Sequence, residues 1–132
     1  MKKGGIEMEN KFYKCETCGN IIQKIHDSGV SVVCCGQPMK ELFPNTNDAA
    51  FEKHVPVVTV EGNKVHVVGS VEHPMIETHW ITWIGIETKK GWQKVDLMAS
   101  DKPEADFILA EDDVLLAAYE YCNLHGLWKK AI

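Results

Sequence analysis

The chain has 132 residues, carries a formal net charge of −5 with histidine neutral, and is 45% hydrophobic and 25% charged. This length suits one ordinary domain or one small unit joined to a medium one, and the apolar fraction is large enough for a buried core. The acidic balance argues against nucleic-acid binding, which requires a basic face. No run approaches the roughly 20 apolar residues that cross a bilayer, so we expect no membrane partner.

The first predicted unit spans residues 1–43 and contains short strands separated by turns. Between Lys11 and Leu42 the turn formers lie at residues 18–20, 27–29 and 35–36. A segment of this size buries little apolar surface and usually needs a covalent or metal staple. Four cysteines in the segment provide the ligands for such a staple.

A turn-rich stretch, Phe43–Ala50, separates this unit from a second one predicted to span residues 44–132. Strand signals dominate the second unit, and Gly62-Asn63 between two β-branched runs predicts a hairpin. The strand candidates cover residues 55–60, 64–69, 77–88, 92–98 and 106–110. Their spacing is typical of a β-sandwich. The propensity of Glu111–Tyr121 favours a helix.

Five cysteines indicate metal binding rather than a disulfide framework. They are Cys15, Cys18, Cys34, Cys35 and Cys122. An odd number of cysteines favours reduced thiols in the cytosol, and the charged start at Met1–Gly5 is not followed by the apolar segment of a signal peptide. We therefore expect a cytoplasmic protein whose thiols bind metal, and the six histidines support this interpretation.

The four early cysteines predict a tetrahedral metal site. The turn in Cys15-x-x-Cys18 brings two sulfurs to one ion. Cys34 and Cys35 are adjacent and would point apart on an extended chain, so both reach that ion only through a local bend. The spacing fits zinc in a structural ribbon as well as iron. A thioredoxin-like redox pair is disfavoured because no βαβ pattern surrounds the cysteines.

Four histidines and the last cysteine predict a second metal site. The candidate ligands are His54, His73, His79, Cys122 and His125. His73 and His79 flank a turn before a long predicted strand, and Cys122-x-x-His125 is a common spacing of metal ligands. Five ligands exceed the four of a structural zinc site, suit Fe²⁺ and leave a position open, as in reactive metal sites. We interpret His26 and His66 as ordinary surface or packed residues.

Several motifs resemble the two-iron form of the desulfoferrodoxin family. Two motifs resemble its N-terminal desulforedoxin-like domain: Phe12-Tyr13-Lys14-Cys15-x-x-Cys18-Gly19-Asn20 and Val33-Cys34-Cys35-Gly36-x-Pro38-Met39. Four further motifs resemble its superoxide reductase domain: Glu52-Lys53-His54-Val55-Pro56, Val71-x-His73-Pro74-Met75, His79-Trp80-Ile81-x-Trp83-Ile84 and Glu120-Tyr121-Cys122-Asn123-Leu124-His125-Gly126. The resemblance runs from about Phe12 to Trp128.

The resemblance implies a mainly β fold with two domains. A small rubredoxin- or desulforedoxin-like metal-bound domain at residues 1–43 would precede an immunoglobulin-like β-sandwich at residues 44–132. In that fold Val114–Tyr121 is a strand, against its helix propensity. We follow the resemblance, because Cys122 must arrive at a fixed point beside the sheet.

The resemblance also implies an enzyme, a superoxide reductase that reduces superoxide to hydrogen peroxide by one electron in the defence against oxidative stress. It implies two iron ions per chain, Fe(Cys)₄ and Fe(His)₄(Cys), and no haem, flavin or nucleotide. The ligands would be Cys15, Cys18, Cys34 and Cys35 for the first iron, and His54, His73, His79, His125 and axial Cys122 for the second.

Two further residues and two partners follow from the same resemblance. Glu52 would occupy the sixth iron position in the oxidised resting state. Lys53 would lie near the open face, where its positive charge attracts the superoxide anion. A small electron carrier such as rubredoxin would restore the ferrous iron, and the protein would be a homodimer.

The residues by themselves leave three other functions open. An electron-transfer protein would hold both irons in coordinatively closed sites. A zinc-ribbon binding module on a sandwich domain would make Cys122 and the histidines incidental. A dismutase would release oxygen as well as peroxide, whereas a reductase consumes external electrons.

Overall fold

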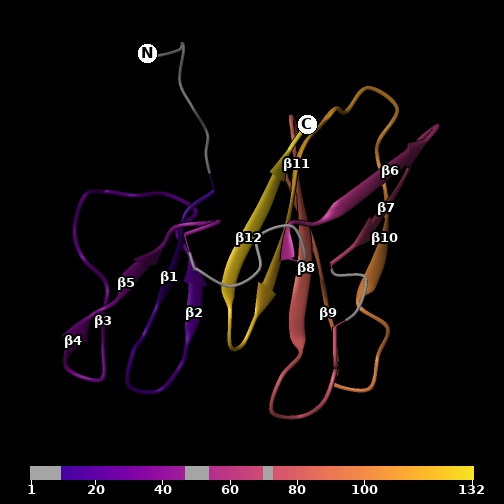
Figure 1. Ribbon diagram of the computed structural model, residues 1–132. Helices are drawn as coiled ribbons and strands as arrows, with labels where there is room; N and C mark the ends of the chain where they lie inside the picture. Colours follow the sequence, from indigo (N-terminus) through magenta and orange to yellow (C-terminus); the bar gives the residue numbers. More distant parts are fainter. Residues whose placement is uncertain (1–9, 47–53, 70–72) are drawn as a thin grey trace. The chain divides into compact units, whose positions relative to one another are not determined.

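The computed structural model describes residues 10–46, 54–69 and 73–132, and these form twelve β-strands (Figure 1). The chain separates into two compact units, residues 1–43 and 44–132. Among the described residues, no helix is both long and apolar enough to cross a membrane. The predicted mainly β architecture is confirmed.

The first unit holds two small antiparallel sheets and very little core. One sheet has the strand order β2-β1-β5, and the other is the hairpin β3-β4. The strands are β1 (Phe12–Lys14), β2 (Ile21–Gln23), β3 (Val33–Cys34), β4 (Gln37–Pro38) and β5 (Lys40–Leu42). Among the unit's described residues, the buried hydrophobic side chains are Phe12, Cys15 and Met39. So small a core supports the expectation that a metal stabilises the unit.

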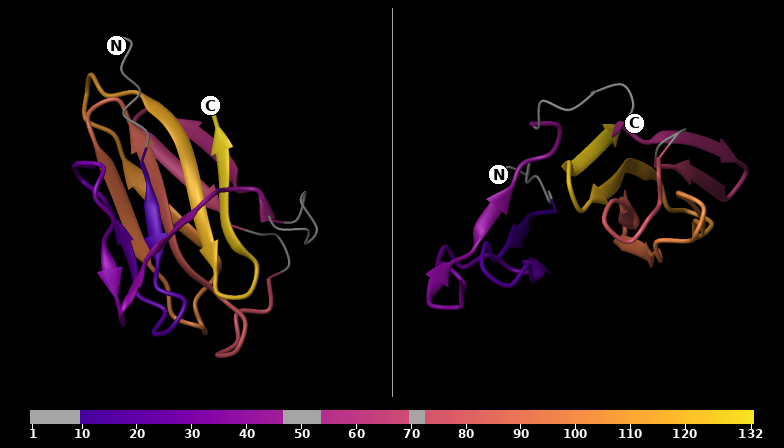
Figure 2. Two further views of the ribbon diagram at one scale, coloured as in Figure 1. Left: turned by 90° about the vertical axis from the view of Figure 1, so that its left-hand side faces the viewer. Right: turned by 60° about the horizontal axis from the view of Figure 1, so that its bottom comes forward.

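The second unit is a sandwich of two antiparallel sheets, seen from two directions in Figure 2. The sheets have the orders β10-β7-β6 and β12-β11-β8-β9. The strands are β6 (Val57–Glu61), β7 (Lys64–Val68), β8 (Ile81–Thr88), β9 (Trp92–Asp96), β10 (Glu104–Ile108), β11 (Leu115–Cys122) and β12 (Gly126–Ala131). Alternate side chains of β7 and β10 are buried, so these two strands turn one face toward the core and one toward solvent.

The predicted hairpin at Gly62-Asn63 is confirmed, since β6 and β7 pair across this turn. The long strand predicted over Glu77–Thr88 begins later, at Ile81. Before it, Ile76 and His79 form a separate bridge with N–H···O distances of 3.0 and 2.9 Å. This tight turn fixes the His79 backbone immediately outside the sheet.

Strand β11 shows how tertiary packing overrides helix propensity. Leu115–Cys122 pairs with β8 on one side and β12 on the other, and all its residues except Leu116 are buried. A central strand buried on both faces accommodates Ala, Leu and Tyr as readily as a helix does. The register to β8 shifts between Tyr121 and Cys122, at the end of the strand.

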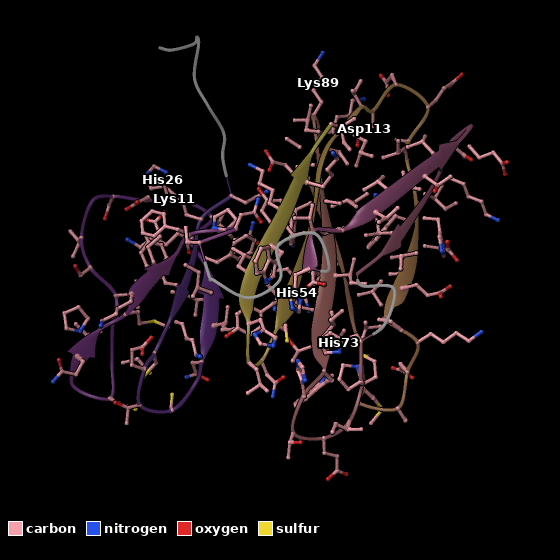
Figure 3. All side chains as sticks on the ribbon, viewed as in Figure 1. Lys11, His26, His54, His73, Lys89 and Asp113 are labelled. Atoms are coloured by element: carbon pink, nitrogen blue, oxygen red, sulfur yellow. The ribbon has the colours of Figure 1, made fainter. Side chains whose placement is uncertain are left out.

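Asp113 ties the turn between β8 and β9 to the start of β11 (Figure 3). It accepts hydrogen bonds from the Thr88 hydroxyl at 2.7 Å and from the backbone N–H groups of Lys90 and Val114 at 2.9 and 2.8 Å. These donors, the Thr88 hydroxyl first, lower the pKa of Asp113 below its ordinary value of 3.8.

We predict that Asp113→Ala lowers the Tm at neutral pH and that the difference from wild type shrinks in acid. A lowered folded-state pKa stabilises the fold above pH 3.8, and this contribution disappears as the pH falls through the lowered value. Thermal unfolding at a series of pH values measures it. Asp112→Ala is the control, because Asp112 pairs only at the surface, with Lys90 Nζ. Equal Tm losses in both variants would contradict the prediction.

Candidate metal centres

The four early thiols lie around a single point in the first unit. Cys15 and Cys18 follow β1, Cys34 ends β3, and Cys35 lies in the β3–β4 turn. All four sulfurs lie within 4.8 Å of one another, and the Sγ atoms of Cys18 and Cys34 are 3.6 Å apart. Metal–sulfur bonds of about 2.3 Å in a tetrahedron give edges of about 3.8 Å. The donor set therefore fits one tetrahedral metal ion.

A left-handed bend brings the two adjacent cysteines to the same side. Cys35 has φ = 53° and Gly36 has φ = 74°, in a region that side-chain-bearing residues rarely adopt. The local bend that the sequence requires at Cys34-Cys35 is thus present.

Crowding makes simultaneous ionisation of these thiols unfavourable without a cation. The Cys18 backbone N–H donates to Cys15 Sγ at 3.4 Å and lowers the pKa of the Cys15 thiol to about 6. Bonds with the Cys15 and Cys18 thiols raise the pKa of Cys35 to about 12 and also raise that of Cys34. A metal ion among the sulfurs would neutralise their charge and favour all four thiolates.

The second candidate centre lies at one end of the sandwich. His73 and His79 come from the segment before β8, and Cys122 ends β11. One ligand atom from each of these three residues lies within 4.8 Å of the others, and His73 Nε2 is 3.3 Å from Cys122 Sγ. The three residues alone can hold a metal.

Two more histidines complete a closed circuit of imidazole rings. The His54 ring centroid is 6.2 Å from that of His73 and 4.7 Å from that of His125. The His79 ring is 4.5 Å from His73 and 4.9 Å from His125. Figure 3 shows His54 and His73 side by side at this end of the sandwich. The structure thus brings together all four histidines and the cysteine that the sequence grouped.

Burial disfavours the charged forms of His73 and His79, and metal binding requires neutral imidazoles. Burial, together with the neighbouring imidazoles of His79, His54 and His125, lowers the pKa of His73 to about 4. Burial also lowers the pKa of His79, whose Nε2 is buried and has no hydrogen-bond partner in the part of the chain that the structure describes. A buried nitrogen without a partner is costly, and a metal bond would satisfy it.

Cys122 is fully buried at the end of β11. Burial raises the pKa of its thiol, while the backbone N–H groups of Leu124 and His125 donate to the sulfur and lower it. The site therefore offers hydrogen bonds to a thiolate but favours the thiolate only when a cation is bound.

Asn123 joins the loop after Cys122 to the loop that carries His79. Its Oδ1 accepts from the Trp80 N–H at 2.9 Å, and its Nδ2 donates to the Thr78 carbonyl at 3.1 Å. The sequence pattern included Asn123 without giving it a role, because its partners lie more than forty residues away.

Glu120 was also missed as a buried acid. Its side chain has no exposed surface, and neither carboxyl oxygen has a hydrogen-bond partner among the described residues. Burial raises the pKa of this carboxyl to about 9, so it is protonated and uncharged at pH 7. Its position two residues before Cys122 in a central strand was the available signal.

The remaining predicted residues lie elsewhere. Glu52 and Lys53 lie outside the described residues, so their predicted roles are carried forward as proposals. His26 is exposed, and His66 Nδ1 is 2.6 Å from Asp106 Oδ1 on the outer face of β7 and β10. Neither histidine belongs to the groups of ligands that the described residues form.

Two family models match the chain. The model described as desulfoferrodoxin matches residues 46–131, and the model of the desulfoferrodoxin N-terminal domain matches residues 7–42. The chain is 50% identical over 126 residues to the protein named desulfoferrodoxin from Nitratidesulfovibrio vulgaris, with 92% of this chain and 98% of that protein covered.

Two solved structures resemble the chain as well. The superoxide reductase from Treponema pallidum superimposes with a TM-score of 0.79 and 36% identity, covering 92% of this chain and 97% of that one. The superoxide reductase (1Fe-SOR) from Giardia intestinalis superimposes with a TM-score of 0.52 and 30% identity, covering 61% of this chain and 96% of that one.

We predict that single ligand substitutions remove the two metals independently. Cys15→Ser should remove the metal of the first centre, and Cys122→Ser that of the second, because each thiolate belongs to a different ligand group. Elemental analysis per folded chain should fall from two ions to one in each variant. Loss of both ions in either variant would contradict two separate centres.

Proposed function

The chain belongs to the desulfoferrodoxin family, and from this premise we infer that it is a superoxide reductase that converts superoxide to hydrogen peroxide. The observation that carries this function is the second centre, where imidazoles and a buried thiol converge at one end of the sandwich. Solved structures named superoxide reductase share this chain's fold. The enzyme has two iron centres, which fit the two ligand groups.

We assign the ligands of each centre to one domain. In the domain of residues 1–43, the four thiolates would hold the first iron. In the domain of residues 44–132, the four imidazoles of the circuit and the Cys122 thiolate would hold the second. The short Sγ–Sγ and Sγ–Nε2 distances and the ring circuit support this assignment.

When bound, ferrous iron at the second centre supplies the electron of the reaction O₂•⁻ + e⁻ + 2H⁺ → H₂O₂. Five protein ligands leave one place of a six-coordinate ion for a small anion. Imidazoles that bind a metal are neutral and would add no charge, and the N–H groups of Leu124 and His125 stabilise the Cys122 thiolate. The chain's contribution is therefore to fix the ligands and their charge.

Lys53 and Glu52 would control access to the open position. A unit positive charge about 5 Å from superoxide attracts it by roughly 3 kcal/mol at an effective dielectric near 20, and solvent exposure reduces this value. Lys53 directly precedes the buried His54, which favours it for this role. Glu52 would close the position in the oxidised state and leave when the centre is reduced.

The partners follow from the reaction and from the resemblance. Each turnover consumes one electron, so an external donor is required, and we propose a small electron carrier such as rubredoxin. We also propose a homodimer on the resemblance to the family. The five free cysteines favour a reducing compartment, the cytoplasm.

The function is tested by the products that the iron-loaded chain forms. We expect one hydrogen peroxide per superoxide consumed, a stoichiometric demand for reductant, and no release of oxygen. Cys122→Ser should abolish the reaction. Oxygen evolution without consumption of reductant would indicate a dismutase instead. A spectrum of the second centre that azide leaves unchanged would indicate a closed electron-transfer site.

We predict that Lys53→Ile slows the reaction with superoxide by roughly tenfold at low salt and weakens its dependence on ionic strength. Rapid mixing at several salt concentrations measures both effects. Lys64→Ile is the matched control, because Lys64 lies on the β6–β7 hairpin. An unchanged rate with unchanged salt dependence would exclude the steering role.

A further inference from the structure

We propose that Trp128 is a positioning residue of the second metal centre. Its indole would fix His54 by ring stacking and His125 through a hydrogen bond, so that two ligands from distant segments meet the metal in one geometry. The inference rests on the ligand set proposed above.

Trp128 contacts both histidines through different parts of its side chain. The indole is fully buried on β12 and stacks on the His54 ring, with centroids 5.2 Å apart and planes 21° apart. Its Nε1–H donates to the His125 carbonyl oxygen at 3.1 Å. One rigid aromatic group therefore limits the rotation of one ligand ring and the backbone conformation of another.

The bond to His125 fixes the turn that carries two ligands. Cys122 pairs with Gly126 across the β11–β12 hairpin, and His125 lies in the turn between them. Gly126 has φ = 85°, which closes this turn. Because Trp128 donates to the carbonyl three residues earlier, a change of turn conformation would move the His125 ring relative to the Cys122 sulfur.

The contact to His54 matters because no described strand contains that residue. His54 precedes β6, and its ring stands beside those of His73 and His125. The stacked indole provides a flat apolar surface that restricts the ring to one plane and so reduces the conformational entropy lost on metal binding.

Asn45 fixes the backbone on both sides of Trp128. Its Nδ2 donates to the Lys129 carbonyl at 3.0 Å, and its Oδ1 accepts from the Lys129 N–H at 2.9 Å. Its own N–H donates to the Leu127 carbonyl at 3.0 Å. Asn45 adopts φ = 61°, which asparagine tolerates better than most residues. These bonds hold the β12 backbone on either side of the residue that carries the indole.

A purely structural role for Trp128 predicts a different outcome from a positioning role. As a core residue alone, Trp128 would affect the Tm without affecting either metal. As a positioning residue, it affects how tightly the second centre holds iron and how the thiolate interacts with it, and it leaves the first centre unchanged.

The experiment compares Trp128→Phe, Trp128→Leu and the control Trp92→Phe in the iron-loaded chain. Trp92 lies on β9 and contacts Trp83 and Tyr119, away from the histidines. The measurements are the rate of iron loss from each centre to a chelator, the thiolate-to-iron absorption band, and the Tm.

We expect Trp128→Leu to accelerate iron loss from the second centre by about tenfold to a hundredfold, the effect typical of residues that orient metal ligands, and to shift its absorption band. Trp128→Phe keeps a stacking ring and should show a smaller acceleration. Trp92→Phe should change neither quantity. A normal iron-loss rate and band in Trp128→Phe and Trp128→Leu, despite a lower Tm, would overturn the proposal.

Two features keep the test decisive. If Trp128→Leu does not fold, the proposal is tested with Trp128→Phe and Asn45→Ala instead. Normal iron retention in both variants would overturn the proposal. Iron retention is also independent of catalysis. A wild-type chain that fails to reduce superoxide refutes the proposed function, whereas unchanged iron loss refutes the positioning role alone.

Discussion

The second centre depends on groups that are buried together and are unfavourable in their charged forms. Cys122 has no exposed surface, burial lowers the pKa of His73 to about 4, and the buried Nε2 of His79 has no partner among residues 10–46, 54–69 and 73–132. Burial makes a charged thiolate or imidazolium costly here, and the nitrogen without a partner is costly even when neutral. A cation offsets these costs together, because it stabilises the thiolate and satisfies the neutral imidazoles.

The two metal centres differ in how far the surrounding fold depends on the metal. The first unit buries only a few side chains among its described residues, so its four thiols depend on the metal to hold the turns around it. The second unit has a continuous core between two sheets, contributed mainly by β7, β8, β10 and β11. Its ligands therefore lie on or beside strands that pack without the metal. Iron therefore stabilises the fold of the first unit, whereas in the second unit it is the reactive group and the fold forms around its own core.

The sequence predicted the parts of this arrangement that depend on residue type and spacing. The cysteine pairs and the β6–β7 hairpin are examples, because each has a local signal. Local propensity alone favoured a helix where β11 lies, since the burial of Leu115–Cys122 between two neighbouring strands is a property of the whole fold.

The supporting residues had no comparable signal. Asn45 bonds to Lys129 across 84 residues, and Asn123 bonds to Thr78 across 45. From the sequence alone, Trp128 is expected to be an ordinary core residue, and only the structure shows its contact with His54. Hydrogen bonds of this kind depend on tertiary distance, which spacing along a single chain does not encode.

The β11–β12 hairpin also has a consequence for protein design. Residues 122–128 contain a thiol, an imidazole, a glycine with a positive φ and an indole that hydrogen-bonds across the turn. The segment is thus a compact chelating module whose geometry is set by its own turn and by hydrogen bonds to Asn45, Thr78 and Trp80. Transplanted onto the edge of another antiparallel sheet, with an asparagine to hydrogen-bond the outer strand, it would give a host protein two of the five ligands of a mixed sulfur–nitrogen site.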